Sequence, residues 1–583
     1  MHRFAVPAAF LMAAVVSAQT AYFPLKDIRP GMHATGRTVF SGARIEEFRV
    51  EILGVLENIG PKESLILARL SGGPLAETGV LQGMSGSPVY MDGKLVGAVA
   101  MAFPFAKEPI AGIRPIEDML RVASANSEPV RQAKLSLEKG DLTAMLPRPE
   151  EALADDMRMV DIATPVSFGG FTRAAVEHFA PQLRALGLEP RQGVSGGGRV
   201  AARMGDPAAL EPGSMISVQL MTGDMSIGAD GTVTHIDHDK IYAFGHRFLS
   251  VGPTELPFAR SEVLTLLPNL SSSFKISAPK EWMGTISQDR NTAIAGELGR
   301  RAHMAPISIM LTRAGRKIEG YEMQMVNDRF LAPFLMQIAV FSAIDSTQRT
   351  LGAATYSVRG EIEFQGNEPP LKLNNMYSGD ANTAQLVSLS SAIPLAYVLQ
   401  SGFSSLEVKK VELAIECFDE KKQLQIDQVV AAPHEVRPGE TVRLTAVLVG
   451  DNGAEVTRAV DYLVPVGAPP GPLCFTVADG NVTNIAEYRQ IVGETPRSAE
   501  RLVANVNKLR ANTKAYVRVW RPEPNFQLEG EDFPDPPPSL ALILGNADTA
   551  ATQARNSKIE ELEISAGDAV ISGGKTVQVE IKE

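Results

Sequence analysis

A glycine-rich turn followed at once by a strand, a tight turn and a second strand most restricts how this chain can fold. The turn reads GMSGSP over residues 83–88, and the apolar segments PVYM and KLVGAVA flank the pair Asp92-Gly93. Asp-Gly between two apolar runs is a strong hairpin signal. The nucleophile elbow of α/β-hydrolases instead leads from a strand into a helix. The segment therefore predicts part of a β-barrel.

Strand signals separated by Gly, Pro and Asp-Gly turns fill residues 22–122 and return from Ser214. A chain of 583 residues is too long for one hydrophobic core. We expect a mainly β protein with several β-rich units and a C-terminal β-sandwich-like accessory domain. The expected units are a β half-barrel over 22–125, a mixed helical bridge over 126–213, a β-rich unit with insertions over 214–425, and the β accessory region over 426–583.

Composition excludes several classes of protein. With 44% hydrophobic and 21% charged residues, the chain has the balance of a globular protein and not that of a disordered one. The formal net charge of -11 and the lack of Lys/Arg clusters argue against nucleic acid as a partner, because phosphate binding needs clustered cations.

The N-terminus has the pattern of a secretory signal peptide. A basic start precedes an apolar run over residues 4–16, and small residues at Ser17 and Ala18 follow it. A membrane anchor is the alternative, but the run is shorter than the roughly 20 residues that a spanning helix needs. We expect cleavage near Ala18 and a periplasmic or secreted protein without a stable membrane span. Cys417 and Cys474 can pair in such a compartment or stay separate.

Ser85 is the candidate nucleophile of the glycine-rich turn. Acyl transfer needs an exposed hydroxyl on a sharp turn, N–H groups aimed at the developing oxyanion, and a base within reach. Gly83 and Gly86 allow a strained turn without a clash of side chains. The N–H groups of Gly83 and Ser85 are therefore the candidate oxyanion hole.

The stretch GVLQGMSGSPVYMDGKLVGAVA, with ILARLSGGPL before it and PIAGIRPIEDML after it, closely resembles the sporulation stage IV B (SpoIVB-type) peptidases. These are secreted serine endopeptidases whose fold is related to that of trypsin. The resemblance covers residues 50–122 and implies that Ser85 is the nucleophile and that the substrate is a peptide or protein. It does not extend to the C-terminal third of the chain.

The resemblance also selects the general base. The family has its catalytic histidine after an apolar strand and a GTVTxIDxDK-like hairpin, and GTVTHIDHDKIYAFGHRFL places His246 there. A hydrogen-bonded structural histidine is the alternative. The other histidines considered as the base are His33, His178, His235, His238, His303 and His434.

The order of the two motifs departs from that of the family, in which histidine precedes serine. The resemblance therefore implies two half-barrels of a chymotrypsin-like double β-barrel in circularly permuted order. Catalytic geometry is indifferent to chain order, so such a permutation preserves a site. This order predicts that residues 22–122 pack against residues 214–300, with the site between them.

Of the expected catalytic residues, the acid that orients His246 is the least well defined by the sequence. In the family it lies shortly before the serine motif, but residues 69–73 hold no acid. Asp289 lies at the distance after the histidine that is typical of trypsin-like barrels, and Asp224 and Asp237 are the next candidates. A surface role for Asp289 beside Arg290, or a Ser–His dyad completed by a backbone carbonyl or water, stays open.

No cofactor is expected. His235 and His238 in HIDH form a possible metal pair, but no third ligand accompanies them and a polar turn explains them as well. Met84 occupies the position at which trypsin-type zymogens use an Asp to pair with a newly cut N-terminus. Activation by such a cut is therefore not expected.

Two functions remain to be separated. The first is an exported serine endopeptidase with Ser85 as nucleophile and His246 as base. The second is a non-catalytic extracytoplasmic binding or scaffold protein on the same fold. The enzyme needs Ser85 Oγ and His246 Nε2 within hydrogen-bond reach, or slightly beyond it without substrate, whereas the scaffold does not.

Overall fold

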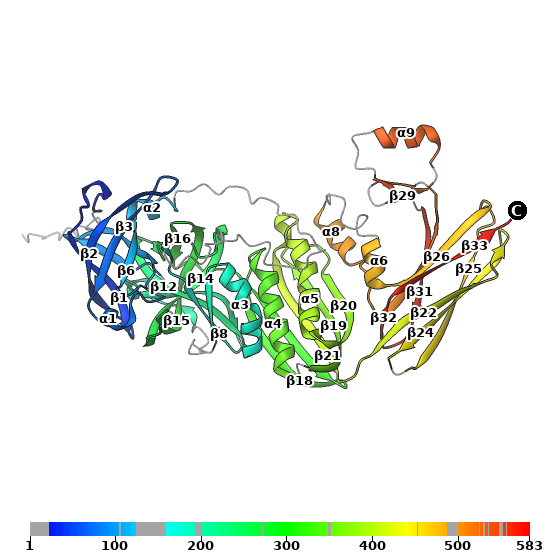
Figure 1. Cartoon of the computed structure of the whole chain (residues 1–583), viewed down its shortest axis with the longest axis horizontal. Helices are drawn as coiled ribbons and strands as arrows, with labels where there is room; N and C mark the ends of the chain where they lie inside the picture. Colours follow the sequence, from blue (N-terminus) through cyan, green and yellow to red (C-terminus); the bar gives the residue numbers. More distant parts are fainter. Residues whose placement is uncertain are drawn as a thin grey trace, which may run out of the picture.

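The structure is a computed structural model that describes residues 22–583 apart from several gaps. The gaps are 104–105, 124–158, 193–200, 271, 348–350, 452, 487–497, 524, 529–530, 535, 547–551 and 555–556. The expected signal peptide lies outside the described residues. The molecule is elongated, with β-barrels at the N-terminal end and a β-sandwich at the C-terminal end (Figure 1).

The first barrel contains the glycine-rich turn. Its strands close in the antiparallel order β4-β1-β2-β3-β6-β5, with β5 pairing back to β4. The strands are β1 (His33–Ser41), β2 (Arg44–Gly60), β3 (Glu63–Ser71), β4 (Pro88–Met91), β5 (Lys94–Ala102) and β6 (Ile110–Pro115). The short helix α1 (Leu75–Thr78) precedes the turn, and α2 (Ile116–Leu120) follows β6 directly after Pro115. Pro at the start and acids in the first turn suit such a helix.

The second barrel contains His246. Its strands close in the antiparallel order β11-β14-β15-β16-β13-β12, and β12 pairs back to β11. The strands are β11 (Met215–Gly223), β12 (Ser226–Asp237), β13 (Lys240–Ala243), β14 (Gly252–Leu267), β15 (Phe274–Arg290) and β16 (Ala293–Leu298). The chain is thus mainly β, with two closed barrels in the permuted order expected from its sequence.

The described part of the bridge between the barrels adds strands as well as a helix. These elements are β7 (Val160–Asp161), β8 (Thr164–Gly169), α3 (Arg173–Ala185), β9 (Leu188–Gln192) and β10 (Ala201–Met204). Strand β7 pairs with β5 of the first barrel, and β8 pairs with β12 of the second. Thr172 caps α3 by accepting a hydrogen bond from Ala175 N–H, as Thr does at helix starts.

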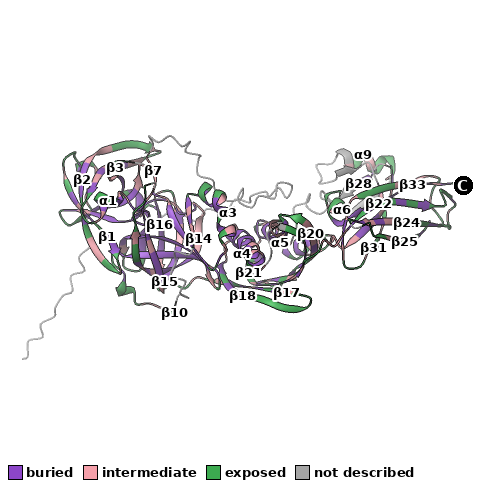
Figure 2. Cartoon of the chain, turned by 60° about the horizontal axis from the view of Figure 1, so that its bottom comes forward, coloured by how far each residue is buried: buried purple, intermediate pink, exposed green. Residues whose placement is uncertain are grey.

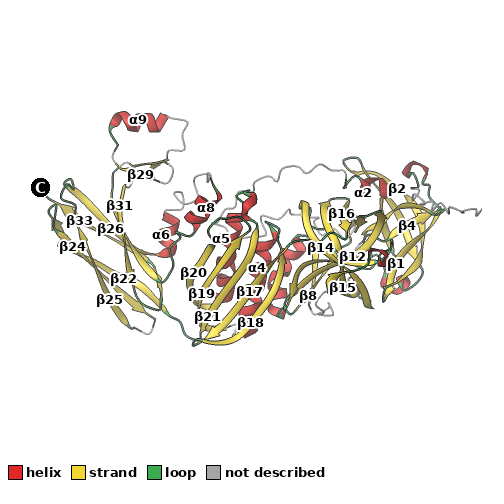
Figure 3. Ribbon diagram, turned by 180° about the vertical axis from the view of Figure 1, so that it is seen from behind, coloured by secondary structure: helices red, strands yellow, loops and turns green. Residues whose placement is uncertain are grey.

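A layer of two helices on a sheet follows the second barrel and continues its sheet through the pairing of β18 with β11 (Figure 3). Its elements are β17 (Met304–Arg313), β18 (Arg316–Val326), α4 (Leu331–Thr347), β19 (Leu351–Phe364), β20 (Leu371–Ala381), α5 (Thr383–Leu399) and β21 (Val408–Phe418). Helix α4 is almost entirely buried and apolar on all sides, which is why its sequence has no helical period. The barrel interior and this layer share one hydrophobic core.

Two sheets pack face to face in the C-terminal region around a separate core, with the strand orders β25-β24-β22-β32 and β23-β33-β26-β27-β31. Their strands are β22 (Gln423–Ala432), β23 (Glu435–Val436), β24 (Thr441–Gly450), β25 (Glu455–Leu463), β26 (Gly471–Asp479), β27 (Lys514–Arg521), β31 (Ser557–Ser565), β32 (Val570–Ser572) and β33 (Gly574–Ile581). Helix α8 (Ala499–Val506) contacts α5 and β20 of the preceding layer, whereas α6 (Gly480–Ala486) contacts β26 and β27 of the sandwich. A small sheet of β28 (Asn525–Leu528), β29 (Glu531–Pro534) and β30 (Thr552–Ala554) carries α9 (Pro538–Asn546).

The buried residues line the interiors of the barrels and the helix faces that meet the sheet (Figure 2). Within the described ranges, none of the helices combines the length and the apolar character needed to span a bilayer.

Candidate functional site

The turn around Ser85 has the backbone that its glycines predict. Gly83 and Gly86 have φ of +90° and +91°, a region that strains residues with a Cβ. The N–H groups of Met84, Gly86 and Ser87 donate to backbone carbonyls. Within the described part of the chain, the N–H groups of Gly83 and Ser85 have no backbone acceptor. These two donors are the pair that the sequence singled out for an oxyanion.

Strand β12 of the second barrel holds the turn through three hydrogen bonds. Thr232 N–H donates to Ser85 O at 2.9 Å, and Thr232 Oγ1 donates to Gly83 O at 2.9 Å. Thr234 Oγ1 donates to Gly86 O at 2.7 Å. A Cβ on Gly86 would lie 2.0 Å from Thr232 O, so the two barrels approach too closely for any side chain there. The nucleophile turn is therefore part of the interface between the barrels.

His246 follows β13 after Phe244 and Gly245, both of which have positive φ. Its Nδ1 lies 2.6 Å from Arg247 O, and because a carbonyl oxygen only accepts, Nδ1 carries the proton. Nε2 is buried and has no hydrogen-bond partner. This tautomer leaves a lone pair on Nε2, which is what a general base requires. Burial lowers the pKa of the imidazole and thereby keeps it neutral.

Ser85 and His246 lie on facing surfaces of the two barrels. Gly86, next to Ser85, contacts Phe244, and a Cβ on Gly245, next to His246, would lie 3.2 Å from Ala100 Cβ on β5. Ser85 Oγ is also buried without a partner, so no hydrogen bond joins it to His246 Nε2. Ser85 is 0% and His246 2% exposed, so both unpaired atoms are buried in this structure.

Asp289 accepts hydrogen bonds from backbone N–H groups and not from the imidazole of His246. It is fully buried at the end of β15, and its carboxylate accepts from the backbone N–H groups of Phe248 at 2.8 Å and Leu249 at 2.6 Å. Burial raises its pKa to about 6, although these N–H groups oppose the rise. Asp289 therefore holds the loop that follows His246 and is not a surface residue beside Arg290. The Nδ1 proton of His246 goes to the carbonyl of Arg247.

Asp161 is a charged residue near His246 that the sequence analysis did not single out. It lies on β7, and its carboxylate raises the pKa of His246, second only to the opposing effect of burial. Its Oδ2 is 3.8 Å from Arg247 Nε. The segment was assigned to a connecting bridge, and an Asp before Ile-Ala-Thr-Pro has no motif that would have marked it.

Lys275 was also missed, although a Lys between apolar neighbours in FKISA was a detectable signal. It is buried on β15, its side chain packs beside Gly83, and its Nζ donates to Thr38 Oγ1 at 2.7 Å. Burial lowers its pKa to about 7, opposed by the charge of buried Asp230. Burial likewise raises the pKa of Asp230 to about 6. Lys275 and Asp230 both belong to the second barrel, and the hydrogen bond from Lys275 to Thr38 of β1 joins that barrel to the first.

The comparison with protein families bears on the barrel that carries this turn. Residues 16–120 match the SpoIVB peptidase S55 family. The resemblance expected from GMSGSP is therefore confirmed, and it supports a serine peptidase. The matched residues include Ser85 and Gly83 but neither His246 nor Asp289. Searches of curated proteins and of solved structures found no match.

Two of the other candidate histidines have partners on neighbouring side chains. His235 Nε2 lies 3.2 Å from the hydroxyl of Tyr22, and His238 pairs with Asp237 on the surface. In the described ranges, no three His, Cys, Asp or Glu side chains are placed to hold a metal ion. Cys417 and Cys474 are buried and do not form a disulfide with each other. Met84 is buried in the core of the first barrel, which explains an apolar residue at that position.

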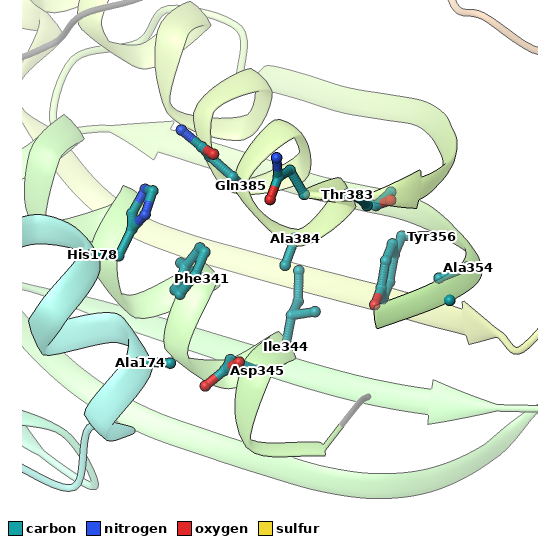
Figure 4. A pocket seen from close by; sticks show the side chains of 13 residues that line it. Ala174, His178, Phe341, Ile344, Asp345, Ala354, Tyr356, Thr383, Ala384 and Gln385 are labelled. Carbon is teal, nitrogen blue, oxygen red and sulfur yellow. The ribbon is translucent and has the colours of Figure 1, made fainter. Parts of the chain in front are cut away.

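A separate cavity of about 220 Å³ lies among α3, α4 and the start of α5 (Figure 4). His178 stacks on Phe341 at its wall, with ring centroids 4.9 Å apart. Asp345 and Tyr356 line its other side. Ser85 and His246 do not line it, so the cavity is not the site of the serine chemistry.

Proposed function

We propose that the protein is a serine endopeptidase that acts outside the cytoplasm after removal of a signal peptide. Ser85 Oγ attacks the carbonyl carbon of a peptide bond, and His246 Nε2 takes the hydroxyl proton. The N–H groups of Gly83 and Ser85 donate to the oxyanion. His246 then gives the proton to the leaving amine. In the second step His246 takes a proton from a water molecule, which attacks the acyl-enzyme, and returns that proton to Ser85 Oγ.

The observation that carries this proposal is the pair of unpartnered buried atoms, Ser85 Oγ and His246 Nε2, on facing barrels. Buried polar groups are almost always hydrogen bonded, and exceptions call for a functional reason. Protonated Nδ1 leaves Nε2 as the acceptor, and among the described residues the N–H groups of Gly83 and Ser85 have no backbone acceptor. In this scheme Asp289 is a positioning residue that holds the histidine loop, and the imidazole is oriented by a backbone carbonyl.

Labelling of the purified protein with a fluorophosphonate probe tests the proposal. We expect the wild-type protein to be labelled and the rate to fall by about 10³-fold or more in both Ser85→Ala and His246→Ala, since the two groups act as a unit. Ser87→Ala and His238→Ala are matched controls that should keep the label. A well-folded wild type without any label would favour the scaffold protein.

A further inference from the structure

The edge of β5 beside the nucleophile turn is occupied by a segment of the same chain. Residues 160–162, here called the strap, run antiparallel to β5 with Asp161 opposite Met101 and Val160 opposite Ala102. Ile162 N–H donates to Ala100 O at 2.9 Å. The strap therefore pairs with β5 through backbone hydrogen bonds, as does a bound peptide that adds a strand to the edge of a sheet.

This edge is adjacent to both reacting groups. Val99 is hydrogen bonded to Gly86 and Ser87 of the turn, so Ala100 is the next residue of β5 beyond the nucleophile. The backbone at Gly245 packs against the same residues, Ala98 to Ala100. Strand pairing at this edge would hold an extended peptide beside the turn that carries Ser85.

The strap is fastened at its middle and at its end. Asp161 lies 3.8 Å from Arg247, the residue after His246, and its charge acts on the imidazole. Ile162 is 4% exposed and packs into the core of the first barrel. In this structure, with the strap paired to β5, Ser85 is 0% and His246 2% exposed.

We propose that the strap is an intramolecular occupant of the substrate edge, and that an extended peptide with an apolar side chain at the position of Ile162 replaces it when the site opens. This inference rests on the proposed function for its consequence, which is that the resting enzyme is self-inhibited. Whether the strap and a peptide compete for this edge of β5 is a question of binding, and it is testable without catalysis.

A reversible cross-link tests the strap. Ala102 and Val160 are directly opposed, and opposed residues on antiparallel strands have Cβ atoms close enough for a disulfide after a small adjustment. In Ala102→Cys/Val160→Cys we expect oxidation to reduce fluorophosphonate labelling at least about tenfold relative to the reduced form. The two single-cysteine variants are the matched controls, and oxidation should not change their labelling. The native cysteines are buried.

A second readout does not depend on catalysis. In the same double variant with Ser85→Ala, a fluorescent peptide of the strap sequence MVDIAT should bind the reduced protein by anisotropy and lose binding on oxidation. Equal binding to both forms would overturn the inference, whatever the labelling shows. Redox-dependent binding without labelling of any form would support the strap and contradict the proposed peptidase.

Discussion

At the scale of single residues, the chemistry depends on how burial sets the state of His246. The imidazole is surrounded by protein, its Nδ1 proton is held by a carbonyl, and its pKa is lowered by burial. A neutral ring at neutral pH is ready to accept a proton. Asp161 opposes the effect of burial and stabilises the charged ring.

The His246 pKa is directly measurable. In the resting protein we expect the ring resonances of His246, assigned by their absence in His246→Ala, to titrate below pH 6.5, the ordinary value. Asp161→Asn should lower the pKa further because it removes the opposing negative charge. The folded state then binds this proton more weakly than the unfolded chain, so the group's contribution to the free energy of unfolding falls as pH drops through 6.5. A midpoint above 6.5 would contradict this prediction.

Asp289 should matter through the loop that it holds. Asp289→Asn keeps the shape but replaces one acceptor oxygen with a donor, which faces the N–H groups of Phe248 and Leu249. We expect a loss of about 1–3 kcal/mol in the free energy of unfolding, measured by denaturant titration, and slower labelling of Ser85. Asp237→Asn, at the exposed runner-up position, should change neither quantity. A fully stable Asp289→Asn protein would refute the positioning role.

At the scale of elements, the site exists only because β12 and the nucleophile turn meet. Thr232 and Thr234 donate to the carbonyls of the turn, and Lys275 of β15 donates to Thr38 of β1. Each barrel thus supplies hydrogen-bonding groups that the other needs. The turn keeps its shape through contacts that lie outside its own strand pair.

Gly86→Ala tests this contact against a matched glycine. A Cβ at residue 86 meets Thr232 O at 2.0 Å and Phe244 N at 2.5 Å, whereas one at Gly93 meets nothing within 4 Å. Both glycines have positive φ, so backbone strain of about 1–2 kcal/mol is common to the two variants. We expect Gly86→Ala to cost about 3 kcal/mol more than Gly93→Ala in thermal or chemical unfolding, and to abolish labelling. Equal stabilities would show that the barrels separate without cost at this point.

At the scale of the whole molecule, the C-terminal region is joined to the helix-and-sheet layer by α8. Leu502 of α8 lies in the large shared core, and the side chain of Asn507 bonds Pro370 O and Lys372 N–H beside β20. The β-sandwich itself has a separate core. These contacts fix its attachment at a distance from the serine chemistry.

Leu502→Asp should loosen this attachment. A carboxylate in place of a side chain that is 1% exposed is unfavourable by several kcal/mol unless α8 detaches. We expect small-angle scattering to show a larger radius of gyration while the labelling of Ser85 stays unchanged. Leu509→Asp, at a residue 41% exposed, is the control and should leave both measurements as in wild type. A loss of labelling in Leu502→Asp alone would show that the C-terminal region acts on the site.

Local features of the sequence determined a good part of this protein. The GMSGSP turn, the Asp92-Gly93 hairpin and the alternating strands of both barrels were predictable because turn geometry and strand period depend on neighbouring residues. Helix α4 was not, because a helix that is apolar on every side has no period to detect. Ser85 and His246 were singled out by motifs of their own.

Only the tertiary structure decided how the site is completed. Asp289 binds backbone amides, Arg247 O holds the Nδ1 proton, and Asp161 is near the imidazole because strands distant in sequence are paired. The pairing of the strap with β5 likewise joins residues that lie far apart in the sequence. The pKa and the hydrogen-bond partners of a buried residue depend on the groups packed around it. Those groups come from distant parts of the chain, so a local sequence pattern does not reveal them.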